Sequence, residues 1–141
     1  MLYRELLENL KGCPFCEGNH TEPLVMREHS YLTYSLAPYH PHHLLILPKR
    51  HIESLTELTD EEEAEIFNLG QIGIRALQKL GYESVSLLVR EGNAKNKSIC
   101  HIHFHLIPEI QIGSLNAKGE DRYVMTESDI EKIVQEIKAV L

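Results

Sequence analysis

The chain has little positive charge and few cysteines, and it contains no long apolar run. Its 141 residues carry 14 Lys and Arg against 21 Asp and Glu, a net charge of −7. Because proteins that coat nucleic acid need an excess of basic side chains, this balance argues against a nucleic-acid polymer as partner but is compatible with a small anionic ligand. No stretch approaches the length that spans a membrane. Residues 1–8 mix charges with leucines, so they do not form the long apolar segment of an export signal. We therefore expect a cytoplasmic protein with no membrane partner.

Nothing in the sequence divides it into parts. No internal repeat, low-complexity stretch or linker is present, and 141 residues can bury a core without cross-links. Three cysteines, two of them close together, suit a reducing compartment better than a framework of disulfides. We expect a single domain over residues 1–141.

Helix and strand patterns can be read along the whole chain. Three helices are predicted: a leucine stripe at 2–10, a long helix from a capping box at 59–62 to Gly81, and a C-terminal helix at about 128–140. Apolar and β-branched segments predict strands at 24–28, 31–37, 43–47, 85–90 and 101–107. Short connections favour an α+β fold with about five antiparallel strands. The glutamates at 61 to 63 are expected to be solvated in the first turn of the long helix.

Three histidines occupy alternate positions of one apolar run, at 101, 103 and 105. Successive side chains of a strand point to opposite faces, so the imidazoles should stand in one solvent-facing row while Ile102, Phe104 and Leu106 enter the core. Two chemistries use such a row. Alternate histidines can bind one catalytic metal ion that activates water. Alternatively, an imidazole can attack phosphorus and form a covalent nucleotidyl-histidine.

A Cys-Pro-Phe-Cys turn at residues 13–16 is a second candidate site. Two thiolates at this spacing can bind one soft metal ion, which then needs two further ligands from elsewhere in the fold. Redox-active dithiols share the spacing, but they belong between a strand and a helix, whereas Gly18, Asn19 and a predicted strand follow here. Zinc is the favoured interpretation, with a redox pair and unliganded thiols as the alternatives.

The triad segment His101–Ile107 matches the pattern His-φ-His-φ-His-φ-φ, φ being apolar, and so resembles the histidine triad (HIT) superfamily. His43–His51 is similar to the family's His-φ-φ-φ-φ-Pro-Lys-x-His segment, and Ser98 falls in the loop before the triad. The resemblance covers about residues 13–108. It implies a HIT-like fold, a small-molecule nucleotide substrate and a homodimer in which two sheets join.

The resemblance also implies roles for single residues. His103 would be the nucleophile that takes up a nucleoside monophosphate unit, and His105 would contact the scissile phosphate and help the leaving group depart. Ser98 would donate a hydrogen bond to the same phosphate. In zinc-containing members the ligand positions correspond to Cys13, Cys16, His51 and His101 of this sequence. A zinc ion with four protein ligands has no open position, so this zinc would be structural and would leave the other two histidines for chemistry.

Two branches of the superfamily fit parts of the sequence. Residues 13–19 and 38–49 resemble galactose-1-phosphate uridylyltransferases and dinucleoside-polyphosphate phosphorylases, but those enzymes usually carry glutamine at the position of His105. The third histidine favours a hydrolase acting on a dinucleoside polyphosphate, a nucleoside phosphoramidate or a related nucleotide. Transfer to a non-water acceptor and a non-catalytic nucleotide-binding module are the alternatives.

Three departures from the usual family pattern concern substrate binding. Ser35 stands where an acidic residue commonly meets the ribose hydroxyls, Arg90 replaces an asparagine, and Asn96 with Lys97 replaces a Gly-Gln pair. Arg90 and Lys97 could pair with additional phosphates or with a sugar phosphate. The alternative is a solvated basic loop in which Asn96 only forms a turn.

Overall fold

The computed structural model describes residues 2–16, 23–35, 37–92, 97–110 and 126–139. Its contacts form two compact units, Met1–Ile110 and Gln111–Leu141. The second unit contains α3 (Glu127–Lys138), which begins where Thr126 Oγ1 accepts a hydrogen bond from Asp129 N–H at 3.2 Å. This is the C-terminal helix that the sequence predicts. A single domain over residues 1–141 stays a prediction.

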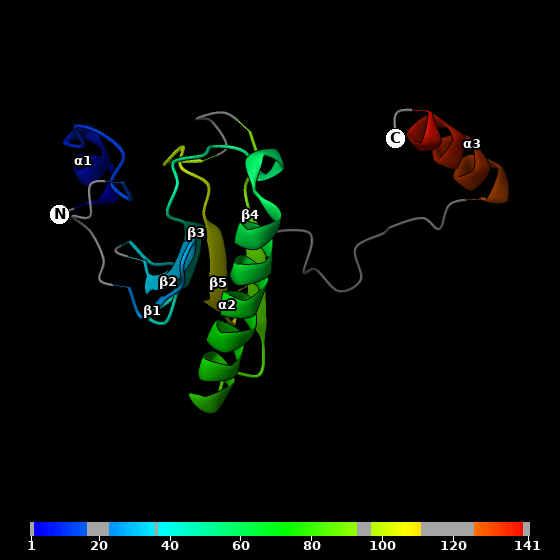
Figure 1. The fold of residues 1–141 in the computed structure, drawn as a ribbon. Coiled ribbons are helices and arrows are strands. Elements are labelled where there is room, and N and C mark those ends of the chain that lie inside the picture. The colour runs from blue at the N-terminus through cyan, green and yellow to red at the C-terminus, as the bar shows by residue number, and fades with distance from the viewer. Residues whose placement is uncertain (1, 17–22, 36, 93–96, 111–125, 140–141) are drawn as a thin grey trace. The chain divides into compact units, whose positions relative to one another are not determined.

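A five-stranded antiparallel sheet forms the centre of the first unit (Figure 1). Its strands are β1 (Val25–Met26), β2 (Ser30–Tyr34), β3 (Leu44–Pro48), β4 (Val85–Val89) and β5 (Phe104–Pro108). They lie in the order β1-β2-β3-β5-β4, so β5, the last strand within the described residues, is inserted between β3 and β4. The α+β fold class and the strand number are as predicted.

The ladder of β5 is shorter than predicted and leaves out two of the three triad histidines. His101 and His103 precede its first residue, in a segment where Ile102 N–H donates to Ile52 O at 2.7 Å, beyond the end of β3. The alternation itself holds, because Ile102, Phe104 and Leu106 belong to the core cluster and the histidines between them do not. The expected solvent-facing row was wrong, since His101 and His103 are only 1% and 8% exposed. Other parts of the chain cover both sides of this segment.

The long helix α2 (Asp60–Lys79) covers one face of the sheet (Figure 1). It begins as predicted: Thr59 Oγ1 accepts a hydrogen bond from Glu62 N–H at 3.2 Å, and the Glu62 carboxylate accepts one from Thr59 N–H at 3.0 Å. Gly81, at φ +100°, follows its end in the left-handed conformation. The expectation of solvent was wrong for Glu62, which is 4% exposed and accepts a hydrogen bond from Arg50 Nε at 3.0 Å.

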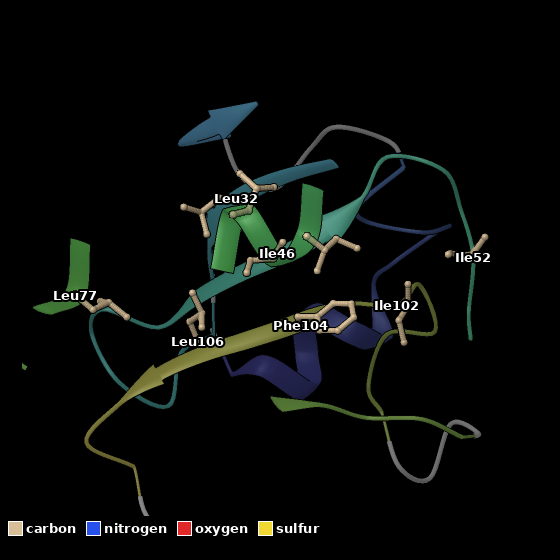
Figure 2. Packing of buried hydrophobic residues seen from close by; sticks show 9 residues of the cluster. Leu32, Ile46, Ile52, Leu77, Ile102, Phe104 and Leu106 are labelled. Carbon is tan, nitrogen blue, oxygen red and sulfur yellow. The ribbon is translucent and has the colours of Figure 1, made fainter. Parts of the chain in front are cut away.

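The hydrophobic core lies between α2 and the sheet (Figure 2). It is built from Leu32, Ile46, Ile66, Leu69, Leu77, Phe104 and Leu106, and Ile52 and Ile102 extend it beyond the strands. Because neighbouring residues of a strand face opposite sides, Leu45 and His105, which pair across β3 and β5, face away from α2. The sheet face opposite to α2 is therefore the one that presents a triad histidine.

Two short helices complete the first unit. The helix α1 (Tyr3–Glu8) lies within the predicted leucine stripe and begins where the Glu5 carboxylate accepts a hydrogen bond from Leu2 N–H at 2.7 Å. The 3-10 helix η1 (Leu55–Glu57) precedes α2. Within the described residues, no helix has both the length and the apolar character needed to cross a bilayer.

Candidate active site and metal site

A cavity of about 370 Å³ opens on the sheet face opposite to α2 and contains most of the predicted catalytic and substrate-binding residues. Those that line it are Ser35, Arg90, Lys97, Ser98, His103 and His105. Asn96 lies outside the described residues. The apolar wall of the cavity comes largely from α1 and the turn that follows it, through Leu6, Leu7, Leu10, Pro14 and Phe15. The cavity thus has a basic, histidine-rich side and an apolar side.

His103 is held as a neutral imidazole with one nitrogen free. Its Nδ1–H donates to the carbonyl oxygen of His101 at 2.7 Å, which leaves a lone pair on Nε2. Burial lowers the pKa of His103, and the positive charges of Lys97 and Arg90 lower it further, against the His101 carbonyl, which raises it. A neutral imidazole with an unprotonated nitrogen is the nucleophilic form of histidine.

A fourth histidine, His43, joins the triad through a hydrogen-bonded chain. Tyr39 N–H donates to His43 Nδ1 at 3.2 Å, and His43 Nε2 lies 2.9 Å from His105 Nδ1. Because His43 Nδ1 accepts a hydrogen bond, the proton of His43 is on Nε2 and is donated to His105. His105 Nδ1 is then an acceptor, and the proton of His105 is on Nε2. This N–H can be donated to the departing group of a substrate.

Both members of this pair are neutral at pH 7. Burial and the neighbouring His103 and His43 lower the pKa of His105 from 6.5 to about 3. Burial, His103 and His40 lower the pKa of His43 to about 4. The tautomers assigned from the hydrogen bonds are therefore those of uncharged imidazoles.

Sequence reasoning did not single out His43, which lines the cavity and contacts His105. It is 2% exposed and immediately precedes β3, and the next residue, Leu44, pairs with Leu106 of β5. A histidine at the start of an apolar strand, in a segment that resembles a family motif, was the available signal. Only the pairing of β3 with β5 brings it to His105.

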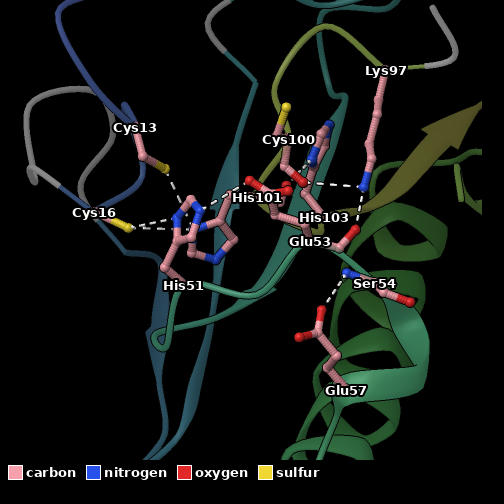
Figure 3. Close-up of polar contacts among 10 residues, drawn as sticks. All are labelled: Cys13, Cys16, His51, Glu53, Ser54, Glu57, Lys97, Cys100, His101 and His103. Carbon is pink, nitrogen blue, oxygen red and sulfur yellow. Dashed lines mark hydrogen bonds and ion pairs between the residues drawn. The ribbon is translucent and has the colours of Figure 1, made fainter. Parts of the chain in front are cut away.

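The charge of Lys97 suggested a contact with phosphate, but its ammonium is bonded to the protein itself. Its side chain is 5% exposed, and its ammonium donates to the backbone carbonyls of Glu53 and, at 3.1 Å, of Cys100 (Figure 3). The ammonium therefore links two loops of the chain. Arg90, by contrast, is exposed and lines the cavity.

Four potential metal ligands converge next to these residues (Figure 3). Ligand atoms of Cys13, Cys16, His51 and His101 all lie within 4.8 Å of one another. His101 Nδ1 is 3.5 Å from both sulfurs, and His51 Nδ1 is 3.1 Å from Cys16 Sγ. In a tetrahedral zinc site, the usual Zn–S and Zn–N bond lengths separate a sulfur and a nitrogen by about 3.5 Å. The cluster therefore fits a tetrahedral metal ion.

The outer nitrogens of the two histidines are oriented as metal ligation requires. His101 Nε2–H donates to the Pro48 carbonyl at 2.9 Å, and His51 Nε2 lies 3.4 Å from the Glu53 carboxylate. Since a carbonyl can only accept, the lone pair of His101 is on Nδ1 and points at the sulfurs. Burial lowers the pKa of His101, which favours the neutral form that binds metals.

Comparisons with known proteins identify a family and several relatives of the chain. The family described as HIT domain matches residues 18–112. An uncharacterized HIT-like protein of Methanocaldococcus jannaschii is 27% identical over 131 residues, which cover 89% of this chain and 98% of that protein. The adenosine 5′-monophosphoramidase of Schizosaccharomyces pombe is 28% identical over 104 residues, which cover 74% of this chain and 76% of the yeast protein.

The fold has a counterpart among solved structures. A member of the HIT family from Bacillus subtilis matches with a TM-score of 0.73 and 24% identity, covering 93% of this chain and 98% of the other. At this identity the likeness shows the fold alone.

Proposed function

Because the chain belongs to the HIT domain family, we propose that it hydrolyses a phosphorus anhydride or phosphoramidate bond of a small nucleotide through a covalent His103 intermediate. One observation carries this proposal: a neutral His103 with a free Nε2 lines a cavity beside a second neutral histidine that has an N–H to donate. The relative from Schizosaccharomyces pombe is named for hydrolysis of an adenosine phosphoramidate.

In the first step, for an anhydride substrate, His103 Nε2 attacks the α-phosphorus and forms a P–N bond. The P–O bond to the leaving group breaks, and its electron pair leaves with the departing phosphate. His105 Nε2–H donates a hydrogen bond to that oxygen, while Ser98 donates one to an oxygen of the nucleotidyl group. Splitting one displacement into two lowers the barrier of each.

In the second step, water attacks the phosphorus of the nucleotidyl-histidine. The P–N bond breaks and its electron pair returns to His103 Nε2. The water hydroxyl stays on the nucleoside monophosphate, and the second proton passes to solvent. His103 is thereby restored with its proton on Nδ1.

The test is a substrate panel of dinucleoside polyphosphates, nucleoside phosphoramidates and nucleotide sugars, with release of nucleoside monophosphate as the readout. At least one class should be hydrolysed, and His103→Ala should lower kcat by at least about three orders of magnitude, because removing a catalytic nucleophile can cost on the order of a million-fold. His29→Asn is the matched control, because His29 faces Glu28 outside the cavity. Full activity in His103→Ala would refute the mechanism.

The runner-up function is transfer of the nucleotidyl group to an acceptor other than water. The resemblance of residues 13–19 and 38–49 to uridylyltransferases and phosphorylases supports it, and His105 argues against it. Adding inorganic phosphate to the assay separates the two, because a phosphorylase would yield a nucleoside diphosphate. A non-catalytic binding module would retain AMP and release no product from any substrate.

The four-ligand cluster is proposed to hold a structural zinc ion. Two thiolates and two imidazoles form a donor set that zinc prefers, and four protein ligands leave no open position for a substrate. When bound, the ion would supply a cross-link and no acid–base chemistry. It would join the turn after α1 to the segments that follow β3 and precede β5.

The substrate-binding residues are proposed in revised roles. Arg90, exposed in the cavity, is suited to pair with phosphates beyond the scissile one, and Ser35 offers one hydroxyl to the sugar. Asn96 and Lys97 are proposed to belong to the loop around the phosphate. Because its ammonium is bonded to two carbonyls, Lys97 would act through its positive field and its hold on this loop.

The protein is proposed to act in a reducing compartment such as the cytoplasm. We also propose that it forms a homodimer at the β4 edge of the sheet. In the described part of the chain β4 has a partner on one side only, and Leu87 on it is 46% exposed. A second copy could pair there and join two sheets into one. A monomeric mass in sedimentation equilibrium at micromolar concentration would contradict this arrangement.

A further inference from the structure

A tyrosine from the start of the chain reaches the phosphate side of the cavity. The hydroxyl of Tyr3, the first residue of α1, lies 2.8 Å from Ser98 Oγ, although 95 positions separate the two residues. Both side chains line the cavity that contains His103. The proposed phosphate donor, Ser98, therefore has a protein partner that belongs to neither the triad segment nor the metal cluster.

The contact is supported by the way α1 lies against the cavity. Leu6 and Leu7 of the same helix, and Leu10 just after it, also line the cavity. Leu10 borders the neighbouring hollow as well, together with Cys13. Residues along α1 thus line the cavity, and the Tyr3 hydroxyl is the polar group of this helix that contacts Ser98.

The number of protons on the two hydroxyls determines which of them donates the Tyr3–Ser98 hydrogen bond. A serine hydroxyl has one proton to donate and two lone pairs to accept with, and a tyrosine hydroxyl has one proton. If Ser98 donates its proton to a phosphate oxygen, the hydrogen bond to Tyr3 survives only with Tyr3 as donor. A hydroxyl that accepts one hydrogen bond while donating another is polarised, so its bond to the anion is strengthened.

On the basis of the function proposed above, we propose that Tyr3 is a positioning residue of the phosphate site: its hydroxyl donates to Ser98 Oγ and orients the Ser98 proton toward a phosphate oxygen of the substrate. The N-terminal helix is then part of the nucleotide site. Tyr3 contributes through Ser98 and makes no contact of its own with the reacting atoms.

A double-mutant cycle on AMP binding tests this coupling. Isothermal titration calorimetry would measure the dissociation constant of AMP for the wild type, Tyr3→Phe, Ser98→Ala and the double variant. Loss of one polarising hydrogen bond should weaken AMP binding by about three- to tenfold in Tyr3→Phe. In the Ser98→Ala background the same substitution should change binding by less than about twofold, because the group through which it acts is absent.

The controls separate coupling from a structural effect. Tyr82→Phe removes a hydroxyl that is bonded to His42 outside the cavity, and it should leave AMP binding unchanged. A merely structural Tyr3 would lower the melting temperature and weaken binding equally in both backgrounds. Equal losses in the two backgrounds, or a wild type that does not bind AMP at millimolar concentration, would overturn the inference.

Turnover measured on the same four proteins distinguishes this inference from the proposed function. If the wild type hydrolyses a substrate but the cycle shows no coupling, the inference fails and the hydrolase proposal stands. If AMP binding shows the coupling while no substrate in the panel is hydrolysed, the inference stands for a binding site and the hydrolase proposal fails.

Discussion

At the scale of single residues, the site depends on histidines that are kept neutral by burial. His43 and His105 share one hydrogen bond at 2.9 Å, and their pKa values are lowered to about 4 and about 3. In the unfolded chain both would titrate near 6.5. Below pH 6.5 these two histidines therefore bind protons in the unfolded state while they remain unprotonated in the folded state. The contribution of the two histidines to stability is fully present above pH 6.5 and is lost as the pH falls toward about 4 for His43 and about 3 for His105.

The pH dependence of unfolding tests this neutrality. Each such histidine contributes a slope of at most about 1.4 kcal/mol per pH unit to the free energy of unfolding. His105→Gln keeps an acceptor for His43 but does not titrate, so its urea midpoint should fall less steeply between pH 6.5 and 4.5 than that of the wild type. The metal ligands are unchanged in the variant, so they contribute equally to the slopes of the two proteins. Equal slopes in the two proteins would mean that His105 is not held neutral.

At the scale of elements, the site depends on how closely α2 packs against the sheet that presents it. A Cβ added at Gly73 would collide with Leu106 Cδ1 and come within 3.5 Å of Leu32 Cδ1. Leu106 is fully buried in the core cluster, so a shift of its methyl group has to displace other core side chains. The absence of a side chain at Gly73 thus sets the distance between the helix and β5.

Substitution of this glycine should destabilise the fold although alanine favours helices. Gly73→Ala is expected to lower the free energy of unfolding by about 1–3 kcal/mol through overpacking. Gly70→Ala is the matched control: its Cβ would lie 3.8 Å from Ile46 Cδ1, an ordinary contact, so it should stabilise by roughly 0.5–1 kcal/mol. Urea denaturation measures both. A neutral or stabilising Gly73→Ala would show that α2 can move away from β5.

At the scale of the first compact unit, the cysteine-histidine cluster joins distant segments. Cys13 and Cys16 come from the turn after α1, His51 follows β3, and His101 precedes β5. Because these segments meet only in the folded chain, metal binding should stabilise that state selectively. A metal ion at a hundred times its dissociation constant stabilises by about 2.7 kcal/mol, or roughly 10 °C in melting temperature.

Removal of the metal should therefore be visible in thermal unfolding. A chelator is expected to lower the melting temperature by about that amount, and added zinc should restore it. Cys16→Ser should lose the metal and the zinc response, whereas Cys100→Ser, which changes an exposed thiol outside the four-ligand set, should retain both. Elemental analysis gives the stoichiometry. A wild type that contains no metal and ignores the chelator would contradict the site.

The parts predicted correctly from the sequence are those that depend on neighbours in the chain. The capping box at Thr59, the long helix after it and the approximate strands follow from hydrogen bonds within one turn and from alternation along one strand. The alternating histidines and the Cys-x-x-Cys turn could be found from the sequence pattern itself, whereas the roles within the triad and the choice of His51 and His101 to complete the ligand set came from the family resemblance. The same local reasoning failed where contacts between distant segments matter: Glu62 is buried beside Arg50, and the Lys97 ammonium donates to two backbone carbonyls.

By itself, then, the sequence determined the fold class, the start of the long helix and the residue types that can bind metal or attack phosphorus. Only the tertiary structure decided which histidines are neutral, which nitrogen is free and which partners act on them. Strand pairing brings His43 to His105, and packing of α1 brings Tyr3 to Ser98. The physical reason is that hydrogen-bond partners and burial are set by the three-dimensional packing of segments far apart in the chain, which no local pattern encodes.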